Sequence, residues 1–227
     1  MLMERIDGFA EQNPMLGLRG CRLGIVYPIL PEMQVRAIAT ATAKLKKEGL
    51  DPKPEIMIPL VSTVAELEKL RAVAKKIIAE VAAEEGVELD IEVGTMIELP
   101  RAAVTADEIA TQADFFSFGT NDLTQTTFGF SRDDVEAEFV PQYLQEHLLP
   151  YNPFATIDPG VAKLVEMGVK LGHEGNPDLV CGVCGEHGGD PDSIHTFNKI
   201  GLDYVSCSPY RVPVARLAAA QAALEEE

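Results

Sequence analysis

The sequence is poor in cysteine and has no long apolar run. Its four cysteines in 227 residues are too few for a disulfide scaffold. The start, Met1–Asp7, lacks the basic segment and apolar run of a secretory signal. No segment approaches the roughly 18 consecutive apolar residues of a membrane-spanning helix. We therefore expect a soluble, cytoplasmic protein whose cysteines are reduced.

Positive charge is also scarce. Lysine and arginine number 19 against 36 aspartates and glutamates, a formal net charge of −17. Such a surface repels nucleic acid phosphates and anionic lipid headgroups, so neither is expected as a partner. An acidic protein that binds an anionic substrate needs a local site that overcomes its own field, and a bound divalent cation is one way to provide it.

What the chain does contain is an alternation of strand and helix signals. The apolar runs predict five strands, at 55–61, 91–98, 115–119, 179–184 and 203–207. Several are apolar at consecutive positions, which favours parallel strands covered on both faces. Helical spacing predicts helices over 33–48, 64–85, a short segment after Thr105, 159–171, 191–200 and 213–226. Thr63 with Glu66 and Thr105 with Glu108 have the spacing of capping boxes.

Consecutive βα units form either an open doubly wound sheet or part of an eight-stranded barrel. A complete barrel takes about 250 residues, roughly 30 per unit. Here five units and a long aromatic-rich insertion at 124–158 already occupy residues 55–227, and the first 50 residues hold no convincing strand. We therefore predict an α/β fold in which 1–227 is the C-terminal portion, about five βα units, of a (β/α)8 TIM-type barrel. A connection as long as 124–158 is usually functional or an interface.

Two carboxylates stand where neighbouring strands end, which is where parallel α/β folds place their sites. Glu98 ends the second predicted strand, and Asp122 follows the third. Mg²⁺ commonly takes one or two protein carboxylates and fills its shell with water and substrate oxygens. The alternatives are that Glu98 pairs with Arg101 and that Asp122 caps a following turn.

The residues next to Asp122 are suited to an anionic substrate. Asn121 could orient a carboxylate or enolate oxygen with its side-chain amide. Gly119 and Thr120 could offer backbone N–H groups to the same anion, although such residues are common in turns anyway.

Cys184 ends the fourth predicted strand. Cys181 and Cys184 have the spacing of a zinc or redox motif, but a second pair is missing, and on a strand the two side chains point to opposite faces. A thiol beside Glu186 and His187 is better interpreted as a proton donor or nucleophile whose pKa those neighbours set.

Arg19 and Arg22 are the cations of a glycine-rich loop near the start. Their spacing fits the binding of a substrate anion and fits a surface ion pair equally well.

Four strings, taken in order, resemble the phosphoenolpyruvate-utilising enzymes, a family that includes pyruvate, phosphate dikinase, phosphoenolpyruvate synthase and enzyme I of the bacterial sugar phosphotransferase system. The strings are 13–22 (NPMLGLRGCR), 94–101 (GTMIELPR), 116–125 (FSFGTNDLTQ) and 184–191 (CGEHGGDP). The resemblance covers nearly the whole chain. The version at 184–190 and the aromatic insertion are most similar to the dikinase branch.

The resemblance implies a (β/α)8 domain that binds pyruvate or phosphoenolpyruvate with Mg²⁺. Glu98 and Asp122 would hold the metal ion, and Asn121 would bind the substrate. Cys184 would exchange the proton at C3, and Arg19 would assist the phosphoryl group. Implied partners are the phosphohistidine and ATP-binding domains of the full-length enzyme and a second copy in a homodimer.

The chain departs from the family in lacking the first barrel strands, with their two arginines, and the other two domains. We therefore expect that it does not run the full dikinase reaction by itself. The alternatives are a catalytically inactive half-barrel that serves folding or dimerisation, and a relative similar to phosphoenolpyruvate synthase.

Overall fold

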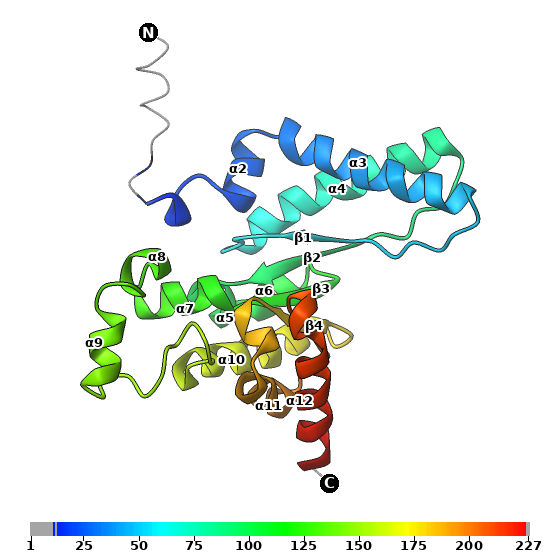
Figure 1. Ribbon diagram of the computed structural model, residues 1–227. Coiled ribbons are helices and arrows are strands. Elements are labelled where there is room, and N and C mark those ends of the chain that lie inside the picture. Colours follow the sequence, from blue (N-terminus) through cyan, green and yellow to red (C-terminus); the bar gives the residue numbers. More distant parts are fainter. Residues whose placement is uncertain (1–10, 12, 226–227) are drawn as a thin grey trace.

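The computed structural model describes residue 11 and residues 13–225 (Figure 1). Its centre is one sheet of five parallel strands in the order β1-β2-β3-β4-β5. The strands are β1 (Glu55–Ile58), β2 (Glu92–Ile97), β3 (Phe115–Gly119), β4 (Val180–Cys184) and β5 (Tyr204–Val205). All five lie within the predicted ranges.

The strand order decides between the two candidate architectures. A doubly wound sheet reverses its order at a switch point, whereas here each strand pairs with the next along the chain. Because parallel crossovers are right-handed, an unbroken order places all the connecting helices on one face, as in a barrel. The prediction of an α/β partial barrel is confirmed.

In Figure 1, α3 and α4 lie near β1 at one edge of the sheet, and α10, α11 and α12 lie near β4 toward the other edge. The longer ones are α2 (Gly20–Val26), α3 (Ile29–Lys47), α4 (Val64–Glu85), α7 (Thr120–Phe128), α10 (Pro159–Gly175), α11 (Pro191–Ile200) and α12 (Val212–Glu225). Shorter ones are η1 (Pro14–Leu16), α5 (Pro100–Val104), α6 (Ala106–Ala110), α8 (Arg132–Val135), α9 (Val140–Gln145), η2 (Glu186–Gly189) and η3 (Pro209–Arg211). Among the described residues, no helix combines the length and apolarity needed to cross a bilayer.

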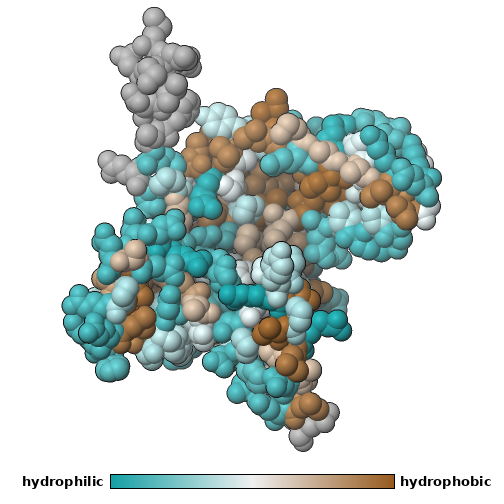
Figure 2. Space-filling view, viewed as in Figure 1, coloured by the Kyte–Doolittle hydropathy of each residue, from teal (hydrophilic) through white to brown (hydrophobic). Residues whose placement is uncertain are grey.

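Alternate residues of each strand face opposite sides of the sheet. Phe116 and Phe118 of β3 pack outward against α10, where a Cβ on Gly172 or Gly168 would lie 2.9 or 2.7 Å from their rings. Glycine at these two positions therefore allows α10 to approach the sheet. The inner face is open, since Met57 and Val180 are 40% and 44% exposed. Figure 2 shows apolar side chains in a recess between the α3–α4 pair and helices α10–α12.

Of the two predicted capping boxes, one is confirmed. Thr63 and Glu66 exchange hydrogen bonds at the start of α4, which ends at Gly86 in the left-handed conformation. The prediction for Thr105 and Glu108 is wrong, because the Thr105 hydroxyl donates instead to the carbonyl of Arg101. The chain there continues directly from α5 into α6, so the hydroxyl is used by the preceding turn.

The connection at 124–158 carries its own small core. Its first residues complete α7, and helices α8 and α9 follow. Val135, Val140 and Phe154 are buried together. Phe130 stacks on Phe128 and meets Phe139 edge to face, with ring centroids 5.0 and 5.1 Å apart. The aromatic residues thus hold this segment together rather than remaining free on its surface.

Asp114 ties the sheet to α4 at the edge where the strands begin. Its carboxylate accepts the backbone N–H of Val93 at 2.8 Å and the Lys75 ammonium at 3.1 Å, and it also pairs with Arg71. Burial would raise the pKa of this carboxyl, but these three donors together hold it below its usual value.

Replacing Asp114 with asparagine should lower the free energy of unfolding at pH 7 by about 1–2 kcal/mol, because three donors lose a charged acceptor. A carboxyl with a depressed folded pKa stabilises the fold above its unfolded pKa, and that contribution disappears as pH falls through the folded pKa. Urea unfolding should therefore show a difference in stability between wild type and Asp114→Asn that narrows as pH falls below the ordinary aspartate pKa of 3.8. Asp51→Asn is the control, since Asp51 is exposed and pairs only with exposed Lys53 among the described residues.

Candidate active site

Glu98 lies directly after β2 and is 2% exposed. Its Oε1 accepts the backbone N–H of Leu60 at 2.6 Å. Leu60 has a left-handed backbone, φ 58°, which is uncommon for a residue with a branched side chain. This turn after β1 directs the Leu60 N–H at the carboxylate. The Leu60 N–H thus fixes the position of the Glu98 carboxylate.

Asp122, in the first turn of α7, lies next to Glu98. The pKa of Glu98 is raised to about 7. Burial, the charge of Asp122 and a hydrogen bond between the two side chains raise it, and the Leu60 N–H and the charge of Arg19 oppose this increase. Glu98 therefore takes up a proton more readily than an exposed glutamate does.

Gly119 makes room for this pair. A Cβ on Gly119 would lie 2.5 Å from Oε2 of Glu98, closer than any real contact. Glycine at the end of β3 is therefore required for the Glu98 carboxylate to lie over the strand end.

The alternative roles weighed for the two carboxylates are wrong. Arg101 donates to the carbonyl of Ser62, and Glu98 has no ion pair among the described residues. Asp122 does not cap a following turn with its side chain. It lies inside α7, where its Oδ1 accepts the side-chain amide of Gln125 at 3.1 Å.

Asn121 and Thr120 connect β3 to the loop after β4. The Asn121 Oδ1 accepts the backbone N–H of Glu186 at 3.3 Å, which leaves its NH₂ group to donate elsewhere. The Thr120 side chain is fully buried, with its hydroxyl 2.8 Å from Nδ1 of His187 and 3.2 Å from the carbonyl of Cys184. Its hydroxyl thus supports the loop that carries Cys184.

His187 is the residue that sequence reasoning misassigned. It is fully buried, and its Nε2 lies 2.8 Å from the carbonyl of Pro153. A carbonyl only accepts, so Nε2 carries the proton and Nδ1 accepts from the Thr120 hydroxyl. Burial lowers the pKa of His187, which keeps the ring neutral. His187 therefore links the 124–158 connection to the site and is not a partner of Cys184.

Cys184 ends β4 and is paired in register with Gly119. Burial raises the pKa of its thiol, a hydrogen bond with Ser117 lowers it, and the charges of Glu98 and Asp122 raise it. The prediction that Glu186 and His187 set this pKa is thus wrong, because the groups that act on the thiol come from β2, β3 and α7. Cys181 is fully buried and belongs to the main core, so the two thiols do not share a ligand.

The two arginines of the glycine-rich loop differ. Arg22 donates to the carbonyl of Gly17 at 3.0 Å and thereby closes the loop on itself. Arg19 is exposed, precedes α2, and is close enough for its charge to lower the pKa of Glu98. Of the two loop arginines, Arg19 is thus the one whose charge acts on Glu98.

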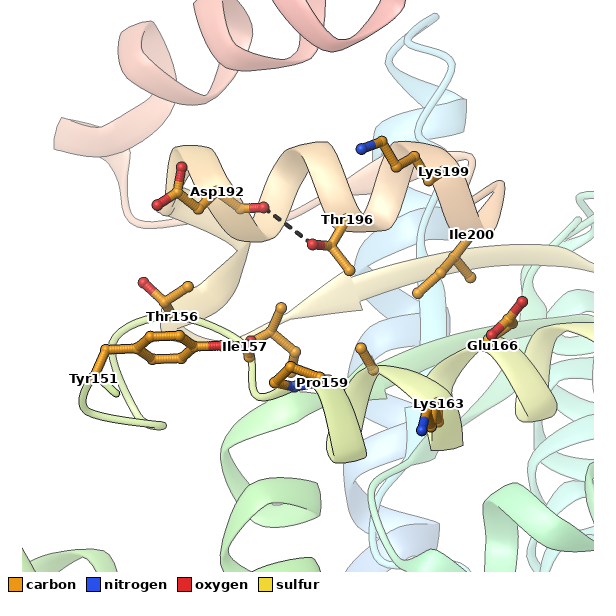
Figure 3. A pocket seen from close by; sticks show the side chains of 11 residues that line it. Tyr151, Thr156, Ile157, Pro159, Lys163, Glu166, Asp192, Thr196, Lys199 and Ile200 are labelled. Carbon is orange, nitrogen blue, oxygen red and sulfur yellow. Dashed lines mark hydrogen bonds between the residues drawn. The ribbon is translucent and has the colours of Figure 1, made fainter. Parts of the chain in front are cut away.

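Two cavities are lined by residues from the C-terminal half of the chain. One, of about 530 Å³, opens between α10 and α11 on the outside of the sheet, where Tyr151, Lys163 and Lys199 surround it (Figure 3). It contains none of the residues above. A smaller one, of about 270 Å³, follows β4 and β5 and is lined by Glu186 and Arg211 among others. Glu98, Asp122 and Cys184 therefore line neither of these two cavities.

The chain matches one protein family and several of its curated members. The family described as "PEP-utilising enzyme, PEP-binding domain" matches residues 2–224. The chloroplastic pyruvate, phosphate dikinase of Flaveria bidentis is 56% identical over 221 residues, 97% of this chain and 23% of that protein. The pyruvate, phosphate dikinase of Clostridium symbiosum is 53% identical over 225 residues, 98% of this chain and 26% of that protein. The chain thus spans about a quarter of the length of these curated relatives.

A solved structure supports the fold alone. The crystal structure of a citrate lyase from Burkholderia xenovorans LB400 superposes with a TM-score of 0.54 at 17% identity, over 83% of this chain and 53% of that one. The family match, by contrast, runs through every strand and every strand end described above. This chain belongs to the phosphoenolpyruvate-binding domain family of the PEP-utilising enzymes.

Proposed function

We propose that the chain forms the pyruvate- and phosphoenolpyruvate-binding face of a pyruvate, phosphate dikinase. That phosphotransferase interconverts ATP, pyruvate and phosphate with AMP, phosphoenolpyruvate and diphosphate through a phosphohistidine. The relatives are about four times as long, so the ATP-binding and phosphohistidine steps are assigned to other parts of a longer protein. A homodimer is part of the same proposal.

The observation that carries the proposal is the buried carboxylate pair. Glu98 is held by a backbone N–H and faces Asp122, with no paired cation among the described residues. Two adjacent carboxylates in a desolvated position repel each other, and a divalent cation removes that repulsion. Mg²⁺ commonly uses one or two protein carboxylates and fills its shell with water and substrate oxygens, so these two side chains are enough to hold it.

Bound at Glu98 and Asp122, Mg²⁺ would act as a Lewis acid that stabilises negative charge on the enolate oxygen. The Asn121 amide would donate to a substrate oxygen, and Arg19 would meet the phosphoryl group. Together with the ion they would allow the site to bind an anion despite the net charge of the chain.

Cys184 is proposed as the acid that supplies the proton at C3. Its raised pKa keeps the thiol protonated at neutral pH, which is the state required of a donor. In the direction of pyruvate formation, the S–H bond breaks, a C–H bond forms at C3, and the electron pair stays on sulfur. The reverse direction uses the thiolate as the base.

The test is a titration of the chain with Mg²⁺ and oxalate, an enolate mimic, followed by amide NMR shifts. Mg²⁺ and oxalate together should shift the signals of Leu99, Asn121 and Asp122, and oxalate alone should not. Asp122→Asn should weaken the response at least tenfold, because one of two charged ligands is lost. Asp133→Asn removes an equal charge from α8 and should behave as wild type.

The proposal would be abandoned if wild type showed no joint response to Mg²⁺ and oxalate at millimolar concentrations. Shifts that persisted unchanged in Asp122→Asn would instead remove Asp122 from the metal site.

A further inference from the structure

Gln125 lies about one turn after Asp122 in α7, and both ends of its side-chain amide are hydrogen-bonded. Its Nε2 donates to Oδ1 of Asp122 at 3.1 Å, and its Oε1 accepts the backbone N–H of Arg132 at 2.9 Å. Arg132 is the first residue of α8. One half-buried glutamine therefore joins a proposed Mg²⁺ ligand to the helix that follows in the chain.

Gln125 also stabilises the turn between these two helices. Its backbone carbonyl accepts the N–H of Gly129, the left-handed residue that ends α7, and the N–H of Phe130 at 2.9 Å. Together with the bond from Arg132, these contacts use the backbone and Oε1 of Gln125. None of them involves Nε2, so the turn alone requires an acceptor at position 125 and does not require a donor.

The donor end of the amide acts on the orientation of Asp122. A carboxylate has two oxygens, and with Oδ1 bound by Gln125, Oδ2 is left for a cation. The backbone of α7 is fixed at the same point, because the Thr126 hydroxyl donates to the carbonyl of Asp122 at 2.7 Å and lies 3.5 Å from the carbonyl of Glu98. Helix α7 thus passes the end of β2 at the residue that carries the other carboxylate.

The chemical demands of the two neighbours explain why position 125 carries an amide. Among side chains of similar length, glutamate would accept from Arg132 but would not donate to Asp122, and lysine would donate but would not accept. Side chains that hold a metal ligand from behind fix its orientation, and their removal commonly lowers metal affinity by about 10–100-fold. The contact between Gln125 and Asp122 has this arrangement.

We propose that Gln125 is a positioning residue that holds the Asp122 carboxylate in the orientation needed to bind Mg²⁺, with the first backbone N–H of α8 as its support. The inference rests on the proposed function of Glu98 and Asp122. Gln125 acts on the ion only through Oδ1 of Asp122. The beginning of α8 thereby contributes to the site although none of its side chains reaches the ion.

The first experiment is a calorimetric titration of the chain with Mg²⁺ at a fixed concentration of oxalate. Gln125→Met keeps the length of the side chain and loses the amide, so it should weaken Mg²⁺ binding about tenfold. Gln142→Met is the matched control and should bind as wild type does. Gln142 donates to Glu146 at 2.7 Å in an exposed position, so the control loses the same kind of bond away from the site.

A second pair of variants removes the support without changing Gln125. Arg132→Pro eliminates the backbone N–H that Oε1 accepts, and proline is well tolerated at the first position of a helix after an extended residue such as Ser131. Arg132→Ala loses the same side chain, including its ion pair with Glu136, but keeps the N–H. Mg²⁺ binding should therefore be about threefold weaker in Arg132→Pro than in Arg132→Ala.

Urea unfolding of each variant separates positioning from folding. A merely structural role of Gln125 would lower the free energy of unfolding and leave the Mg²⁺ affinity of the folded chain unchanged. Wild-type affinity in Gln125→Met, or equal affinities in Arg132→Pro and Arg132→Ala, would overturn the inference while the proposed function stands. Wild type that failed to bind Mg²⁺ would overturn both. If Gln125→Met did not fold, the two Arg132 variants would decide the question.

Discussion

Replacing Glu98 with glutamine is expected to abolish Mg²⁺ binding and, in the absence of the ion, to stabilise the chain at alkaline pH. Glutamine keeps an oxygen for the Leu60 N–H and removes the charge that is buried beside Asp122. Relief of that repulsion should add on the order of 2 kcal/mol to the free energy of unfolding at pH 8. Glu98, the proposed Mg²⁺ ligand, would thus be retained at a cost in folding stability.

The pH dependence follows from the raised pKa of Glu98. Between the ordinary value of about 4.5 and the folded value of about 7, the unfolded state loses its proton first, so stability falls as pH rises across this window. Urea unfolding should show this fall in wild type and not in Glu98→Gln, with the two chains equally stable near pH 4. Equal stability at pH 8 would contradict the prediction.

Thermal melting completes the test. Mg²⁺ at millimolar concentration should raise the melting temperature of wild type, because a ligand that binds the folded state stabilises it, and should not affect Glu98→Gln. Glu92→Gln is the control, since Glu92 is exposed at the opposite end of β2 and loses the same charge.

Replacing His187 with phenylalanine should destabilise the chain by about 2–4 kcal/mol. The change leaves the buried Pro153 carbonyl without its donor, which costs about 1–3 kcal/mol, and it removes the hydrogen bond of the Thr120 hydroxyl, which keeps only the Cys184 carbonyl at 3.2 Å as an acceptor. Because His187 ties the aromatic connection to the site, its loss should also loosen that segment.

Urea unfolding and limited proteolysis measure the two effects. Cleavage should concentrate between Phe130 and Phe154 in His187→Phe and be slow in wild type. The gap in stability should narrow below about pH 6.5, since the unfolded state takes up a proton first when burial lowers the pKa of a histidine. His195→Phe is the control, because His195 meets only exposed Glu225 among the described residues. Cleavage outside residues 124–158 would contradict a local effect of His187 on this connection.

Helices and strands with clear start and stop residues were predicted correctly from the sequence. The strand at 115–119 and the helices at 64–85 and 191–200 have the predicted bounds. Thr63 caps α4, Pro191 begins α11, and Gly86 and Gly201 end these helices in left-handed conformations that favour glycine. Helices α8 and α9, with four and six residues, are too short for a periodic pattern and were not predicted.

The sequence predicted which residues stand at the strand ends, but it did not predict the contacts that their side chains make. Glu98, Asp122 and Cys184 follow from the rule that parallel strands gather their carboxyl ends on one edge. The partners of His187 lie 67 and 34 residues away, and nothing local in the sequence indicates them. Gly119 and Gly182 similarly depend on the register between strands, which places a carboxylate over one and an aromatic ring over the other.

The residues at the two ends of the strands have different roles. Glu98, Asn121, Asp122 and Cys184 stand on the rim where the strands end, whereas the Asp114 tie that fastens the sheet to α4 stands on the rim where they begin. We therefore expect substitutions among these strand-end residues to change the site without weakening the attachment of the sheet to α4. Binding and folding stability can then be altered independently in this domain.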